Sequence, residues 1–117
     1  MGMSQVDFAA NEDTSSVCSL AEEVDVTGIF LPEAWTDASV GIEAALPDGT
    51  WATVRDETGA EFQVESTPPR RQGLGNLLSV RLPVAQGCQL RLTSGPMVGR
   101  INQLEDVTVT LLWRSAE

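Results

Sequence analysis

The sequence predicts an all-β chain: an antiparallel β-sandwich, jelly-roll-like, with an extended N-terminal arm. Three observations support this fold class. Apolar and polar residues alternate with period two in most segments from Val24 onward. No window of about 12 residues carries the apolar stripe of an amphipathic helix. Turn residues recur roughly every eight to twelve positions, as they do in small sandwiches.

The first 23 residues differ from the rest of the chain. They are rich in Ser, Asp, Asn and Thr and show no sustained period. We therefore expect residues 1–23 to form an extended arm, ordered only where a partner or neighbouring subunit holds it. Residues 24–117 are expected to form the β-sandwich domain. A short helix near residues 18–23 is the weaker alternative, since Ser16 could cap its first turn.

Each strand expected in residues 24–117 has one apolar and one polar face. Near the C-terminus, for example, Val107, Val109 and Leu111 alternate with Thr108 and Thr110. Strands of this kind suit sheets that are buried on one side. The expected strands cover residues 24–31, 40–46, 51–55, 60–65, 78–82, 90–93 and 107–114.

Turn residues separate these strands. Asp48-Gly49 is a strong hairpin signal, and Glu57-Thr58-Gly59 indicates a second tight hairpin directly after it. Residues 66–76 are expected to form a long polar loop, because Pro68 and Pro69 exclude a central strand there.

The charge of the chain is strongly negative and unevenly placed. There are 17 acidic residues and seven basic residues, all of them arginine, and the formal net charge is −10. Residues 1–54 carry ten of the acids and no base. This balance disfavours binding to nucleic acids and to anionic membranes. No apolar stretch approaches the roughly 20 residues of a membrane span, and the N-terminus does not resemble a secretory signal.

Histidine is absent, which removes Ser-His-Asp and Cys-His catalysis and imidazole metal sites. Cys18 and Cys88 belong to no C-x-x-C pair, and nothing beside either thiol activates it as a nucleophile. In a chain without an export signal, two such cysteines are expected to be reduced thiols. We expect that the protein is not an enzyme.

Acidic residues near the predicted hairpins allow two interpretations. They could be calcium ligands or a catalytic carboxylate pair, or they could be turn residues that face solvent. No calcium-loop spacing is present, so we expect neither a metal nor a cofactor. The residues concerned are Asp48, Asp56, Glu57, Glu61 and Glu65.

The three tryptophans have different contexts. Trp51 and Trp113 lie in register with apolar neighbours and are predicted to be core residues, with a sugar-stacking platform as the alternative. Trp35 lies outside any regular strand. It is expected to be the exposed aromatic, either a lid over one end of the sandwich or an interface anchor.

Arginine without lysine favours fixed, bidentate pairing, although a genome-level preference for arginine explains the composition equally well. Arg81, Arg91 and Arg114 are expected on the polar faces of strands. There they could pair with Glu61, with Glu65 or with acids of another chain.

Several segments resemble a known group of proteins. Residues 88–103 run Cys-Gln-Leu-Arg-Leu-Thr-Ser-Gly-Pro-Met-Val-Gly-Arg-Ile-Asn-Gln, and residues 107–114 run Val-Thr-Val-Thr-Leu-Leu-Trp-Arg. Together with residues 48–56 and 58–62, they are similar to small virion proteins of tailed phages. Those proteins share an S-D-G-x-x-W/F hairpin, an "lRiRSGt…pvnQ" stretch and a final "r-x-i-t-l-v-x-R" strand. The resemblance covers residues 24–117 and departs at Ser94-Gly95-Pro96, where Ser-Gly-Thr is usual.

The resemblance implies a virion structural protein, made in the host bacterial cytoplasm and located on the capsid exterior. It would be a cement or decoration subunit, expected as a trimer, that binds the outer surface of the major capsid protein lattice. The alternative is a tail-associated accessory or a receptor- or carbohydrate-binding module. The acidic N-terminal half would meet arginines of a neighbour or of the shell. The expected partner-binding residues are Trp35, Arg70, Arg71, Arg100, Asp7 and Phe8.

Overall fold

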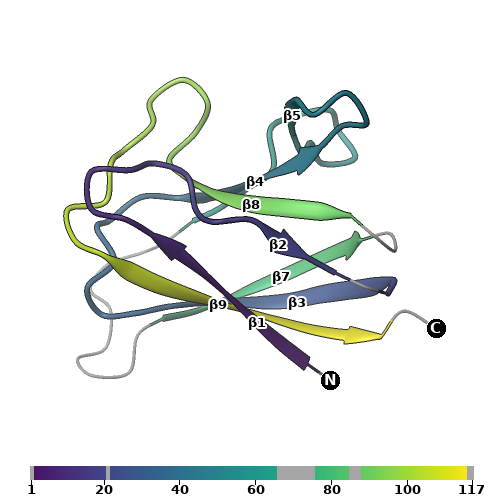
Figure 1. Cartoon of the computed structure of the whole chain (residues 1–117), viewed down its shortest axis with the longest axis horizontal. Helices are drawn as coiled ribbons and strands as arrows, with labels where there is room; N and C mark the ends of the chain where they lie inside the picture. The colour runs from purple at the N-terminus through teal and green to yellow at the C-terminus, as the bar shows by residue number, and fades with distance from the viewer. Residues whose placement is uncertain (1, 21, 66–75, 85–87, 116–117) are drawn as a thin grey trace.

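The computed structural model describes residues 2–20, 22–65, 76–84 and 88–115, which form nine β-strands in two layers (Figure 1). Most of the predicted loop 66–76, including Arg70 and Arg71, lies outside these residues. The strands are β1 (Gly2–Phe8), β2 (Cys18–Ser19), β3 (Val24–Leu31), β4 (Val40–Ala45), β5 (Trp51–Thr53), β6 (Gln63–Val64), β7 (Asn76–Val84), β8 (Gln89–Ser94) and β9 (Val107–Ser115).

Two antiparallel sheets make up the sandwich. Sheet A has the strand order β1-β9-β3-β7, and sheet B has the order β2-β8-β4-β5 with β6 also paired to β4. The predicted all-β sandwich is therefore confirmed. The described residues contain no helix, so the weaker alternative of a helix near residues 18–23 is wrong. The same part of the chain therefore offers no helix long and apolar enough to cross a membrane.

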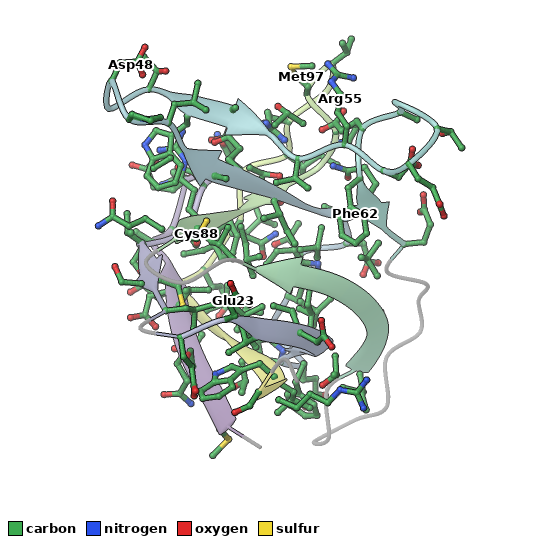
Figure 2. The ribbon with its side chains drawn as sticks, turned by 90° about the vertical axis from the view of Figure 1, so that its right-hand side faces the viewer. Glu23, Asp48, Arg55, Phe62, Cys88 and Met97 are labelled. Atoms are coloured by element: carbon green, nitrogen blue, oxygen red, sulfur yellow. The ribbon has the colours of Figure 1, made fainter. Side chains whose placement is uncertain are left out.

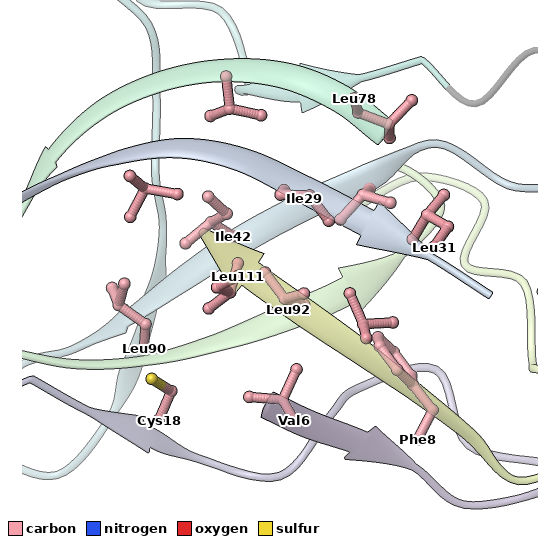
Figure 3. Close-up of a cluster of buried hydrophobic side chains, with 14 of the residues drawn as sticks. Val6, Phe8, Cys18, Ile29, Leu31, Ile42, Leu78, Leu90, Leu92 and Leu111 are labelled. Carbon is pink, nitrogen blue, oxygen red and sulfur yellow. The ribbon is translucent and has the colours of Figure 1, made fainter. Parts of the chain in front are cut away.

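The core lies between the two sheets and follows the period-two pattern. In β9, Val107, Val109 and Leu111 point inward and are buried, whereas Thr108 is exposed. Close-packed apolar side chains of both sheets fill this layer, and their burial is the main stabilising term of such a fold. Those labelled in Figure 3 are Val6, Phe8, Cys18, Ile29, Leu31, Ile42, Leu78, Leu90, Leu92 and Leu111.

The expectation of a separate N-terminal arm is wrong for the described part of residues 1–23. β1 is an edge strand of sheet A, paired with β9 from Gly2↔Trp113 to Phe8↔Val107. Val6 and Phe8 are completely buried, and β2 pairs with β8 in sheet B. Of the three large apolar residues of β1, Met3 is exposed and only Val6 and Phe8 are buried, so the burial of β1 depends on the partner strand rather than on its own pattern.

The two predicted hairpins are confirmed. Gly49 and Gly59 each adopt a positive φ, which glycine tolerates without steric cost. Asp48 and Asp56 accept hydrogen bonds from the side chains of Thr50 and Thr58 at 2.6 Å, and the backbone N–H groups of both threonines bind them too. The threonine hydroxyls lower the pKa of both carboxyl groups. These acids therefore serve the turns.

The two cysteines are free thiols, as predicted. Cys18 is buried in the core, and that burial raises its pKa above the ordinary thiol value. Cys88 is only half-buried, at the start of the segment that leads into β8.

Candidate functional site

The expected exposed aromatic, Trp35, is in fact buried, with 2% of its surface exposed. Its ring packs edge-on against Phe8, with centroids 5.1 Å apart, and its Nε1 donates a hydrogen bond to the Ala38 carbonyl at 3.2 Å. The segment after β3 folds back and uses this side chain to close one end of the core. The expected exposure of Trp35 is therefore wrong, and its position fits the alternative of a lid over one end of the sandwich. Phe8, another expected partner-binding residue, is also completely buried.

Asp7 and Arg100 are both engaged within the chain. Asp7 Oδ1 accepts a hydrogen bond from Thr108 Oγ1 at 2.7 Å, across the β1–β9 pair. It lies beside an open hollow of about 400 Å³ that is lined by Asp7, Phe8, Ala9, Asp106, Val107 and Thr108. Arg100 belongs to a different segment, the connection between β8 and β9. Of the four predicted partner residues that the structure describes, Phe8 and Trp35 therefore pack together in the core, while Asp7 and Arg100 each have polar partners of their own.

The β8–β9 loop (residues 95–106) is instead the most apolar exposed segment of the described chain. Four large apolar side chains of this loop face solvent, and Val98 at its tip is 91% exposed. Sequence reasoning missed them because they lie in a segment of glycine, proline and polar residues with no period. The four are Met97 (48%), Val98 (91%), Ile101 (39%) and Leu104 (73%).

The backbone of the β8–β9 loop is fixed at its base. Gly95 has φ +86°, and a Cβ there would lie 2.8 Å from the Gly99 carbonyl oxygen, so only glycine fits. The Ile101 N–H donates to the Ser94 carbonyl at 2.9 Å, and Arg100 Nη1 donates to the Gly95 carbonyl at 2.6 Å. The loop therefore forms a tight projection, visible at the upper left of Figure 1.

Two carboxylates of sheet B and its hairpin hold the loop from one side. The Glu61 carboxylate accepts the Met97 N–H, with the nearer oxygen at 2.9 Å, and lies 3.9 Å from Arg100 Nη1. Glu43 Oε2 lies 3.4 Å from Arg100 Nη2. The Arg100 side chain is only 19% exposed and lies near both carboxylates, so its positive charge is compensated within the chain. Figure 2 shows Met97 at the end of the molecule where β5 lies.

Arg91 and Arg114 lie on polar strand faces, as predicted, but their partners differ from the expected Glu61 and Glu65. Arg91 Nε lies 2.7 Å from Glu43 Oε1, and Arg114 Nε lies 3.7 Å from Asp25 Oδ2. Glu43 and Asp25 both come from the acidic half of the chain. In these two pairs the acidic half meets arginines of its own chain, whereas it was expected to meet arginines of a neighbour or of the shell. The side chain of Arg81 lies outside the described part of the structure.

Trp51 also departs from its predicted core role. It is half-buried on the outer face of sheet B, and the Arg91 guanidinium carbon lies 4.5 Å from its ring centroid. This is a cation–π geometry. Trp113, by contrast, is partly buried and packs against the core.

Gln103 holds together the loops at the end of the sandwich that Trp35 closes. It is completely buried, and its side-chain amide accepts the Thr36 N–H (2.8 Å) and donates to the Thr36 carbonyl (3.1 Å) and to Ser94 Oγ (3.0 Å). Its backbone carbonyl accepts the Asn11 N–H and its backbone N–H donates to the Glu12 carbonyl. One residue thus joins the segments 9–13, 32–37 and 94–106, which meet at the left of Figure 1.

These contacts give the resembling motif a structural explanation. Ser94 supplies a buried hydroxyl to Gln103, Gly95 makes the turn, and Gln103 closes the network. The motif therefore builds a rigid loop with apolar tips. Within the described residues, no group of three or more acidic or cysteine side chains is placed to hold a metal ion.

Comparison of the chain with known protein families, with curated proteins and with solved structures finds no match.

Proposed function

We propose that this chain is a structural protein of a tailed-phage virion: a capsid cement or decoration subunit that docks on the outer surface of the major capsid protein lattice through its β8–β9 loop. The observation that carries the proposal is the exposed apolar loop itself. Val98 and Leu104 are exposed to 91% and 73% although the loop is held by internal hydrogen bonds. Exposed apolar side chains on a fixed backbone are typical of an interface, because little conformational entropy is lost when they are buried.

The connectivity adds support. Successive strands alternate between the sheets, β1 and β3 in sheet A and β2 and β4 in sheet B, and the alternation resumes from β7 to β9. We infer jelly-roll connectivity from this order. Jelly rolls are common in viral capsid proteins, and also in lectins. Together with the motif resemblance of residues 24–117, this favours a virion component.

The test is binding to purified capsids of a phage whose head genes include this sequence. We expect co-sedimentation with capsids, saturating at several hundred copies per particle, and a loss of binding of about tenfold or more for Val98→Ser combined with Leu104→Ser. Val17→Ser is the matched control, because Val17 is a 50% exposed valine outside the loop. Unchanged binding of the loop variant, with a native melting profile, would refute docking through this loop.

Trimerisation is part of the proposal, since a trimer matches threefold positions of a capsid lattice. Sedimentation equilibrium of the free protein and imaging of decorated capsids measure it. A stable monomer that also binds capsids as isolated copies would contradict it. Deletion of residues 1–23 is not a usable test, because it removes Val6 and Phe8 from the core.

A carbohydrate- or receptor-binding module of the tail is the second candidate, and the half-exposed Trp51 is the observation that favours it. Aromatic rings at a surface can stack on sugars. Glycan binding that is lost in Trp51→Ala, together with six or twelve copies per virion, would favour this function over capsid decoration.

A further inference from the structure

The segments joined by Gln103 place acidic residues next to Leu104. Leu104 is followed directly by Glu105 and Asp106, which are both exposed. Glu12 is exposed on the neighbouring segment, and its carbonyl accepts the Gln103 N–H at 3.0 Å. The apolar part of this end therefore has acids on two adjoining segments of the chain.

This charge is not neutralised locally by the described residues of segments 9–13 and 95–106. These segments contain four acids, Glu12, Asp13, Glu105 and Asp106, and one base. The base is Arg100, whose guanidinium faces Glu43 and Glu61 on the other side of the loop. Asp106 holds the Ala10 N–H at 2.8 Å, which fixes its position but leaves its negative charge.

The chemistry of a partner follows from this arrangement. When Leu104 and its neighbours are buried in an interface, the flanking carboxylates lose water and need a compensating charge. An acidic surface would repel them, and the same end of a second copy of this chain would bring the same acidic side chains against them. Arginine or lysine side chains at the partner's rim would pair with them and would also speed association.

We propose, as a refinement that rests on the docking function proposed above, that the partner surface is an apolar socket rimmed by arginine and lysine side chains. Leu104 would fill the socket, and Glu12 and Glu105 beside it would meet the basic rim, while Val98 would be a second apolar contact from the same loop. The acidic bias of the N-terminal half thus acts partly at this end of the sandwich, next to the apolar residues.

Three synthetic peptides of equal length probe this chemistry on the full chain. One contains leucine and arginine, one leucine and glutamate, and one serine and arginine. Titrations followed by backbone amide NMR shifts should show that the leucine–arginine peptide perturbs residues 97–106 and 10–13. The leucine–glutamate peptide should not bind, and the serine–arginine peptide should bind at least about tenfold more weakly, because it lacks the apolar contact. Shifts located elsewhere, or equal binding of the leucine–glutamate peptide, overturn the inference.

Charge variants test the position of the acids. Glu12→Gln with Glu105→Gln should weaken binding of the leucine–arginine peptide and of capsids by roughly threefold to tenfold at low salt. The difference should disappear near 1 M salt, where the screening length is about 3 Å. The control is Glu22→Gln with Glu23→Gln, which removes the same charge from exposed residues beside Val24. Val24 pairs with Ser115, at the far end of β9 from the loop.

Equal effects of the two double variants would show a response to net charge alone and would overturn the inference. The inference would also be overturned if capsid binding were lost in the Val98/Leu104 variant but did not change with salt or in the charge variants. That result would leave the docking function intact. Capsid binding that ignores the loop residues refutes the docking function itself.

Discussion

Replacing Gln103 with leucine tests whether this residue organises the loop end. The substitution places an apolar side chain of similar size there and removes the amide that makes three hydrogen bonds, two to Thr36 and one to Ser94. Each such bond contributes about 1 kcal/mol net, and a buried group left without its partner costs about 1–3 kcal/mol. Since Thr36 is only half-buried, water can replace part of its loss. We expect a decrease of about 3 kcal/mol in the free energy of unfolding.

That decrease is large for a domain whose total stability is about 5–15 kcal/mol. For a chain of this length it corresponds to a fall in Tm of roughly 10 °C. Urea unfolding followed by tryptophan fluorescence measures it. The control is Gln89→Leu, because Gln89 is exposed and makes one long hydrogen bond, to Ser19 Oγ at 3.4 Å; a change within about 0.5 kcal/mol is expected there. A loss below about 1 kcal/mol for Gln103→Leu would refute the reasoning.

Three further outcomes are expected. Gly95→Ala should lower the free energy of unfolding by about 2 kcal/mol or more, because the new Cβ would clash and the backbone φ is positive. Gly49→Ala is the control: its φ is also positive but the space around the Cβ is open, so urea unfolding should show a loss of only about 1 kcal/mol. The pKa of Asp56 is lowered in the folded state, so the stability that its carboxylate contributes is present above the unfolded pKa near 4 and is lost as the pH falls through the folded pKa. In denaturation curves taken at several pH values, the stability advantage of the native protein over Asp56→Asn should therefore shrink below about pH 4. A difference that stays constant with pH would contradict this. A thiol reagent should modify Cys88 quickly and Cys18 only on unfolding, because Cys18 is buried and its pKa is raised, and equal rates followed by mass spectrometry would be inconsistent with that burial.

The strands that the sequence predicts well are those whose alternation is complete. Residues 24–31 and 40–46 correspond to β3 and β4, each with a buried apolar face. β1 was missed because Val6 and Phe8 are isolated in a polar segment, and their burial depends on pairing with Val109 and Val107 of β9, 103 and 99 positions away. Long-range pairing of this kind leaves no local pattern.

The candidate site was harder to predict, for two physical reasons. Gln103 is a polar side chain that is buried only because three segments bring it their hydrogen-bonding groups, and no periodicity marks such a position. Trp35 was placed at the surface because its neighbours are polar, but the turn after β3 directs its ring onto Phe8. The Ser94-Gly95 pair, by contrast, can be related to a structural role, because both residues fix the base of the β8–β9 loop.

The pairing of β1 with β9 also determines where a polypeptide fused to the chain would lie. Gly2 pairs with Trp113 at one end of sheet A, whereas Phe8 pairs with Val107 at the other end, directly after the β8–β9 loop. The start of β1 and the end of β9 therefore lie together on the side away from the loop, at the lower right of Figure 1. A polypeptide fused to either end would project outward from a surface on which the loop is docked, and the protein would then serve as a display scaffold with two neighbouring attachment points.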